Sequence, residues 1–277
     1  MKKKTLKIIA AVTALAILAG LAWFANAMVG NPISKMLAER TAEKHLEETY
    51  AGTDYYIERI VYSFKDGRYH VFVKSPTSID TEFSLTITML GELRLDTYED
   101  VVEGFNTARR IEQEYRELTD TIFEHPAFPY TCHISYGTLE IYPQEAFDDP
   151  NVDDIPSYAI NQSTLVLDKI YDISELGRQA GHLIIYVESD TVSVETAAEI
   201  MLDIKAIFDE AGVPFVAMDF TLWYPRPEEG TRPDGEVSVA DFPYDAIYKD
   251  RMIDRVEEAD KVLKAYYAEQ DAKCKDN

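Results

Sequence analysis

Histidines and carboxylates are the residues of this chain that could carry catalysis or bind a metal ion. The 277 residues include 50 aspartates and glutamates. The five histidines show no metal-ligand spacing, and we expect each to be an ordinary exposed or hydrogen-bonded side chain: His45, His70, His125, His133 and His182. The motifs HExxH, GxSxG, the Walker loop, GxGxxG and CxxC are missing. The sequence therefore predicts no catalytic residue and no cofactor-binding residue.

Paired carboxylates offer acid–base chemistry such as glycoside hydrolysis. Because 50 acidic residues form close pairs by chance, a pair has little specificity here. Glu140 and Glu188 lie on predicted strands and are the least ordinary candidates. An envelope hydrolase that depends on these two carboxylates is one alternative function.

A short acidic loop has the spacing with which a calcium-binding loop begins. Asp149, Asn151 and Asp153 form a D-x-N-x-D pattern, which offers alternating oxygen ligands to one cation. The pattern then fails, because Asp154 stands where such loops need glycine and Ile160 where they need a bidentate glutamate. We interpret the segment as a solvated loop and predict no metal site, with calcium binding by those three residues as the alternative.

The sequence contains two cysteines, Cys132 and Cys274, and does not decide whether they form a disulfide. An extracytoplasmic protein can oxidise such a pair, but Cys274 lies near the C-terminus, where chains usually fray. Cys132 precedes His133, yet adjacent residues on a strand point to opposite faces, which places the two badly for proton transfer. We expect a half-buried strand cysteine, with a disulfide as the alternative.

The N-terminal segment predicts an association with a membrane. An apolar run over residues 8–29 follows four lysines at positions 2, 3, 4 and 7. As a helix, its 22 residues span about 33 Å, enough to cross the roughly 30 Å hydrocarbon core of a bilayer. Lysines on one side alone hold the N-terminus in the cytoplasm and place the rest outside. The small-x-small sequence Ala25-Asn26-Ala27 keeps open the alternative of secretion after cleavage near Ala27.

The chain beyond residue 30 is strongly acidic. It contains all 50 acidic residues and 23 of the 27 basic ones, which gives a net charge of −27. Such a surface repels nucleic acid and anionic headgroups. The sequence therefore excludes nucleic acid as a partner and leaves two others. These are the cell membrane, contacted through residues 8–29, and another envelope protein.

Residues 30–96 predict one helix and an antiparallel β-meander. Asn31-Pro32 is a good helix start, and apolar residues recur behind it at helical spacing. Asp66-Gly67 between two strand-like runs indicates a hairpin, and residues 83–89 alternate apolar and small polar side chains. We expect the helix to cover the apolar face of three or four strands.

The rest of the chain predicts a long helix and a second α+β domain. Apolar residues recur every three or four positions over residues 98–123, as on an amphipathic helix. Strand, helix and strand patterns follow one another over residues 183–222, typical of a βαβ unit or an interleaved α/β sandwich. The predicted fold class is α+β. We expect a transmembrane segment at 1–29, a helix-plus-meander domain at 30–96, a linking helix at 97–125 and a C-terminal domain at 126–277.

Several segments of the sequence are similar to segments of a known family: 30–35 with the helix up to Tyr50, 62–67, 75–80, 175–177, 181–183 and 209–215. Together they resemble the YfjL-like family of membrane-anchored Gram-positive bacterial proteins. The resemblance implies an extracytoplasmic setting and a two-part α+β architecture, and it carries over no catalytic or binding residue. The family has a histidine where this chain has Glu82, which weakens a metal or acid–base role for the loop before it. In shape, the N-terminal half also resembles PepSY-type modules, which modulate proteases or sensors at membranes.

We expect a membrane-tethered extracytoplasmic protein that acts by interaction or regulation and not as an enzyme. This hypothesis rests on the apolar N-terminal run, the acidic globular remainder and the missing catalytic motifs. Two alternatives stay open. One is a calcium-binding or calcium-sensing domain that uses the 148–154 loop, and the other is the carboxylate-dependent hydrolase.

Overall fold

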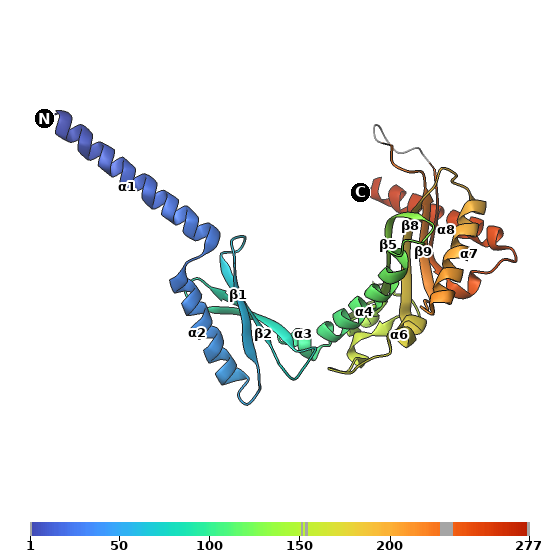
Figure 1. Cartoon of the computed structure of the whole chain (residues 1–277), viewed down its shortest axis with the longest axis horizontal. Helices are drawn as coiled ribbons and strands as arrows, with labels where there is room; N and C mark the ends of the chain where they lie inside the picture. Colours follow the sequence, from blue (N-terminus) through green and yellow to red (C-terminus); the bar gives the residue numbers. More distant parts are fainter. Residues whose placement is uncertain (1, 151, 153–154, 228–234, 276–277) are drawn as a thin grey trace. The chain divides into compact units, whose positions relative to one another are not determined.

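A computed structural model describes residues 2–150, 152, 155–227 and 235–275 of the chain (Figure 1). The chain forms two compact units, Met1–Asn106 and Thr107–Asn277. The N-terminal unit holds an apolar helix and a helix-covered antiparallel sheet, and the C-terminal unit holds a mixed sheet with helices. The predicted α+β class is therefore confirmed.

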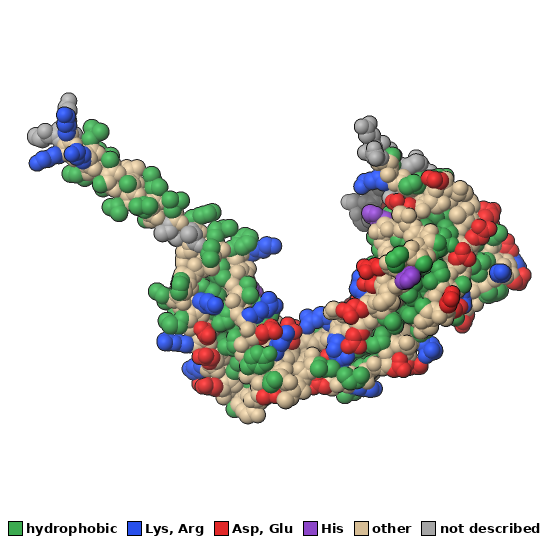
Figure 2. Space-filling view, in the orientation of Figure 1, with side chains coloured by type: hydrophobic (Ala, Val, Ile, Leu, Met, Phe, Trp, Pro, Cys, Tyr) green, Lys and Arg blue, Asp and Glu red, His purple; other side chains and the backbone are tan. Residues whose placement is uncertain are grey.

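Helix α1 (Lys2–Val29) is the apolar run seen in the sequence. Of the described helical residues, only this stretch is long and apolar enough to cross a membrane, and none of its apolar window is buried. Figure 2 shows lysines at its free end and hydrophobic side chains along the rest. Its length and composition are those of a single-pass anchor or of a signal sequence.

Helix α2 (Pro32–Thr49) begins where the sequence predicts it. Asn31 is the N-cap, with its side-chain oxygen accepting a hydrogen bond from the Ser34 amide at 2.9 Å. Pro32 occupies the first helical position, where its missing N–H costs no hydrogen bond. The small residues Ala38 and Ala42 are fully buried, so the helix backbone approaches the sheet closely.

The sheet beneath α2 is a four-stranded antiparallel meander in the order β1-β2-β3-β4. Its strands are β1 (Tyr56–Ser63), β2 (Arg68–Lys74), β3 (Glu82–Thr88) and β4 (Leu93–Asp96). Alternate apolar side chains of β2 and β3 form the core, among them Val71, Val73, Leu85 and Ile87. The predicted helix-plus-meander arrangement is confirmed, and Gly67 adopts the positive φ of +67° that the predicted hairpin turn needs.

The amphipathic segment that follows is two helices and not the single one predicted over 98–123. Helix α3 (Glu99–Val102) ends after one turn, and α4 (Phe105–Phe123) begins three residues later. Gly104 lies between them with a φ of +81°, outside the helical region. The apolar spacing continues across this break, so periodicity alone did not reveal it.

The C-terminal unit is built on a sheet in the order β10-β9-β8-β5. Its strands are β5 (Thr131–Leu139), β8 (Gly181–Glu188), β9 (Ala217–Trp223) and β10 (Glu236–Pro243). β8 and β9 are parallel and are joined through helix α7 (Val194–Ala211), which confirms the predicted strand–helix–strand unit. β5 and β10 pair antiparallel at the two edges.

Smaller elements complete this unit. They are α5 (Gln144–Asp148), α6 (Ile173–Ala180), α8 (Met252–Lys275), the parallel pair β6 (Ile141–Tyr142) and β7 (Ile160–Asn161), and the 3₁₀ turns Gln162–Thr164 and Tyr244–Ala246.

The core of the C-terminal unit joins α4, α7 and one face of the sheet, where Tyr115, Phe208 and Phe220 are fully buried. Strand β8 contributes Leu183, Ile185 and Val187 to this core and directs the residues between them to the opposite face.

Candidate functional site

A buried histidine lies among carboxylates on the sheet face opposite the helical core. His182 is the second residue of β8, and its neighbour Leu183 points into the core, so the imidazole emerges on the other face. It is only 6% exposed. Gly181 before it packs against Tyr115, and a side chain there would collide with the tyrosine hydroxyl and with the Gly177 carbonyl. The start of β8 is therefore fixed closely in place.

Both ring nitrogens of His182 are hydrogen-bonded to carboxylates. Nδ1 lies 2.7 Å from Glu140 Oε1, and Nε2 lies 3.0 Å from Asp219 Oδ1. An ionised carboxylate can only accept hydrogen bonds, so a histidine that bonds to two of them must donate from both nitrogens. The ring is then an imidazolium held between two negative charges.

Three further contacts fix the carboxylates. Tyr142 donates from its hydroxyl to Glu140 Oε2 at 2.9 Å, and the Asp241 amide donates to Asp219 Oδ1 at 2.7 Å. Tyr158 donates from its hydroxyl to Asp241 Oδ1 at 2.6 Å. We call the group of Glu140, Tyr158, His182, Asp219 and Asp241 the His182 centre.

The elements around the His182 centre explain how distant residues meet. Glu140 directly follows β5, whose last residue pairs with Gly181, and Asp219 lies on β9 opposite Ile184. Asp241 lies in a bulge of β10 between Val239 and Phe242, with a φ of +48°. Aspartate tolerates this left-handed conformation better than most residues, and the bulge turns its carboxylate toward the centre.

The electrostatics of the centre favour the charged forms of its ion pair. Burial lowers the pKa of His182, but the hydrogen bonds and negative charges of Asp219 and Glu140 outweigh burial and raise that pKa to about 9. Burial raises the pKa of Glu140, but the hydrogen bonds from His182 and Tyr142 outweigh it and hold that pKa below its ordinary value. Burial, with the hydrogen bond to Asp241, raises the pKa of Tyr158, so its hydroxyl stays protonated.

The centre also has the ligand types of a metal site. One ring nitrogen of His182 and one oxygen each of Asp219 and Asp241 lie within 4.8 Å of one another, the only such group of three among the described residues. Imidazole and carboxylate ligands together suit zinc and manganese. Three carboxylates against one imidazolium leave negative charge in excess. A metal ion would bind the neutral ring and would therefore displace its proton.

The structure describes some of the candidate site residues proposed from the sequence. Asp149 is described and exposed, whereas Asn151 and Asp153 lie outside the described residues. Glu140 belongs to the His182 centre at the start of β8, and Glu188 ends that strand. Six residues along a strand cover about 20 Å, which exceeds the roughly 10 Å that a two-carboxylate glycosidase allows.

The remaining titratable candidates occupy ordinary environments. His45 bonds to Asp96 at 2.7 Å, and His70 lies 3.3 Å from Asp66. Cys132 is half-buried, and burial raises the pKa of its thiol to about 11, which disfavours a nucleophilic thiolate. The side chain of Cys274 lies outside the described part of the chain, so the disulfide stays an untested alternative.

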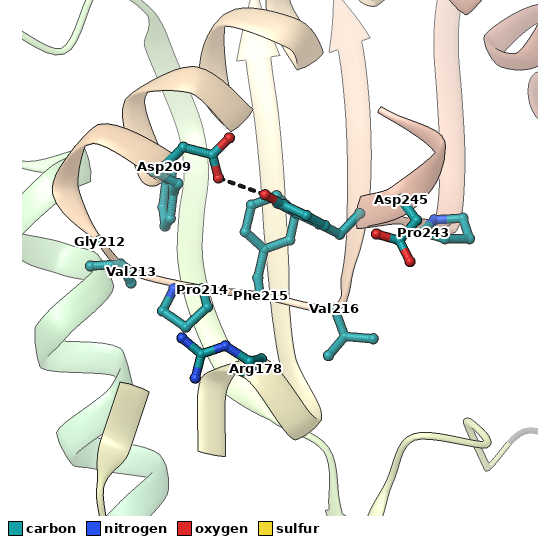
Figure 3. A pocket seen from close by; sticks show the side chains of 11 residues that line it. Arg178, Asp209, Gly212, Val213, Pro214, Phe215, Val216, Pro243 and Asp245 are labelled. Carbon is teal, nitrogen blue, oxygen red and sulfur yellow. Dashed lines mark hydrogen bonds between the residues drawn. The ribbon is translucent and has the colours of Figure 1, made fainter. Parts of the chain in front are cut away.

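A separate cavity of about 530 Å³ lies beside the start of β9 (Figure 3). Its wall combines the aromatic rings of Phe215 and Tyr244 with the charged ends of Arg178 and Asp209. These polar groups already have partners, because Tyr244 donates to Asp209 at 2.8 Å and Arg178 donates to Glu175 at 2.5 Å. The cavity offers apolar surface, but none of these three polar side chains needs a ligand to satisfy it.

Two family models match the chain. The YfjL-like N-terminal domain matches residues 2–97, and the YfjL-like C-terminal domain matches residues 114–257. No curated protein and no solved structure matches. All five residues of the His182 centre fall within the second match.

Proposed function

The chain belongs to the YfjL-like family, and we propose that it is a membrane-tethered, extracytoplasmic module of a Gram-positive envelope. It acts by binding or regulating another envelope component and not as an enzyme. The observation that carries the tether is α1, an apolar helix of 28 residues whose apolar window has no protein surface packed on it. The acidic remainder of the chain fits an exposed, soluble surface.

The junction behind α1 supports a retained anchor over a cleaved signal peptide. Tyr62 of β1 donates from its hydroxyl to the Ala27 carbonyl at 3.1 Å. Asn31 donates from its side chain to Asn26 Oδ1 at 2.7 Å, and Tyr69 donates to the Asn31 carbonyl at 3.0 Å. Cleavage near Ala27 would remove the acceptors at positions 26 and 27, although the folded domain is built to bind them.

Membrane extraction and protease accessibility test the tether. The full chain carries a C-terminal tag, and protoplasts are treated with protease before alkaline extraction. We expect the tag to be lost from outside and the remaining fragment to stay in the membrane with residues 2–27 still attached. A soluble product that begins after Ala27, or a tag protected inside intact cells, would contradict the proposal.

Crosslinking in cells tests the interaction role. Residues 1–29 fused to an unrelated domain serve as the matched control, because they reproduce the anchor without the two folded units. We expect the full chain to capture an envelope protein that the control does not. Equal recovery with the full chain and with the control would count against an interaction module.

The His182 centre favours a second function, the binding of a divalent transition-metal cation. The observation behind it is the convergence of three ligand atoms within 4.8 Å at a place with excess carboxylate charge. The calcium-like loop offers no such observation, because Asn151 and Asp153 lie outside the described residues.

Calorimetric titration of the full chain in detergent micelles with zinc and with manganese tests this function. The chain is first treated with a chelator, and Asp219→Asn is compared with Asp190→Asn, an exposed aspartate just beyond β8. We expect binding that Asp219→Asn abolishes and Asp190→Asn preserves. Identical heats for both variants, or no heat with either metal, would rule the site out.

A further inference from the structure

One end of the N-terminal sheet exposes large apolar side chains at two neighbouring turns. Arg68 pairs with Thr88, so the β1–β2 turn and the β3–β4 turn lie at the same end of the sheet. Phe64 in the first turn is 57% exposed, and Leu90 in the second is 80% exposed. A soluble sheet normally places polar residues at such tips.

The same end of the sheet lies next to the end of α1. Tyr62 lies two residues before the first turn, and its hydroxyl contacts both the Ala27 carbonyl, at 3.1 Å, and Met89 Sδ, at 3.9 Å. Gly30 packs so closely on Tyr62 and Tyr69 that a side chain there would collide with them. The two turns therefore flank the point at which the chain leaves the apolar helix.

The contact between Tyr62 and Ala27 indicates where this end of the sheet would lie relative to the bilayer. Ala27 belongs to the apolar run 8–29, whose length of about 33 Å matches the hydrocarbon thickness. When α1 spans the membrane, Ala27 lies at the boundary between hydrocarbon and headgroups. Tyr62 touches Ala27, and Phe64 follows two residues later, within about 7 Å along an extended chain.

Charge at this end differs from that of the remaining chain. Segments 28–36, 61–68 and 89–94 contain four basic residues, Lys35, Lys65, Arg68 and Arg94, and two acidic ones, Asp66 and Glu92, a net charge of +2. Residues beyond position 30 carry −27 in total. A basic rim around exposed apolar side chains is typical of surfaces that contact anionic headgroups.

We infer that the sheet end formed by Val29, Ile33, Phe64 and Leu90 docks into the headgroup region of the bilayer that α1 spans. The inference rests on the proposed tether. All four side chains are exposed, and immersion would transfer them out of water. The bilayer is the occupant because the docking surface continues the surface of the anchor itself. Docking would hold the N-terminal unit against the membrane.

An environment-sensitive dye tests the docking. Cys132→Ser and Cys274→Ser leave a chain without cysteine, into which Phe64→Cys or Leu90→Cys places a single dye. The matched control is Ile79→Cys, because Ile79 is 58% exposed and lies in the β2–β3 connection at the opposite end of the sheet. Each full-length variant is reconstituted into vesicles of phosphatidylethanolamine and phosphatidylglycerol.

We expect blue-shifted emission and about tenfold weaker quenching by aqueous iodide at positions 64 and 90 than at position 79, because iodide does not enter the headgroup–acyl boundary. Flotation of each sample reports the tether separately. Floating vesicles with equal quenching at all three positions would overturn the docking and leave the tether intact. A chain that fails to float would overturn the tether. Equal protection in vesicles of phosphatidylcholine alone would show that docking depends on the apolar side chains and does not require the basic residues.

Discussion

Raising the pH through the pKa of His182 should destabilise the C-terminal unit. In the folded chain this pKa is raised to about 9, whereas the ordinary value is 6.5. A folded state with the higher pKa binds the proton more tightly than the unfolded state. The stabilisation is therefore fully present below about pH 6.5 and is lost as the pH rises through about 9.

The magnitude follows from the size of the shift. A shift of about 2.5 pKa units corresponds to about 3 kcal/mol at 1.36 kcal/mol per unit. The Asp219 side chain is 36% exposed, so water screens part of its attraction and we expect about 2 kcal/mol. With a urea m-value of about 2 kcal/mol per M, the unfolding midpoint should fall by about 1 M between pH 6 and pH 10.

Urea unfolding followed by tryptophan fluorescence measures this change. Trp223 lies in β9 and reports on the C-terminal unit, and Trp23→Phe removes the only other tryptophan. The full chain is kept in detergent micelles with a chelator, so that no metal ion competes with the proton. His182→Gln replaces the imidazolium by a neutral amide and should cost about 2 kcal/mol at pH 6.

The pH dependence distinguishes this electrostatic role from simple packing. His182→Gln should unfold at nearly the same urea concentration at pH 6 and pH 10, and His125→Gln, at an exposed position after α4, should keep the dependence of the unmodified chain. If the unmodified chain and His182→Gln lost stability in parallel between pH 7 and pH 10, the ion pair would not be the cause and the reasoning would be refuted.

Three further predictions concern single side chains. Asn31→Ala removes the N-cap of α2 and should lower the stability of the N-terminal unit by about 1 kcal/mol, measured by thermal unfolding beside Asn31→Asp, which retains a capping oxygen. Gly177→Ala places a methyl group 2.6 Å from the Tyr115 ring and 2.7 Å from the Pro214 carbonyl and should cost about 2 kcal/mol or more in urea unfolding; an unchanged midpoint would contradict this close packing. Cys132, whose pKa burial raises to about 11, should react with iodoacetamide at pH 8 about 100-fold more slowly than the same thiol in the urea-unfolded chain, and equal rates would contradict its burial.

The sequence predicted those features that depend on neighbouring residues. The Asn31 cap and the Asp66-Gly67 turn each have their signal within a few residues, and both appear in the structure. The parallel pairing of β8 with β9 followed from the strand–helix–strand order, since such units place their strands side by side.

Strand β10 and the His182 centre were missed, the first for a local reason and the second because its residues are distant in the sequence. Strand β10 was not predicted, because the bulge between Val239 and Phe242 interrupts its alternation of apolar side chains. The His182 centre joins residues on β8, β9 and β10 with Glu140, which follows β5, and Tyr158, which precedes β7. The four paired strands bring these distant segments of the sequence together. His182 alone looked ordinary in the sequence. Its position just before the predicted strand that begins at residue 183 was the one local signal that could have singled it out.

The hydrogen bonds between the end of α1 and the N-terminal domain are the strongest support for the proposed retention of α1. A leader that is removed needs no hydrogen bonds from the domain it leaves, yet Tyr62 binds the Ala27 carbonyl and Asn31 binds Asn26. The family match also begins at residue 2 and runs through the meander to residue 97, so it includes the apolar helix. A signal peptide is selected for its hydrophobicity and cleavage site, and neither requires these contacts. Their presence supports the proposed retention of the helix.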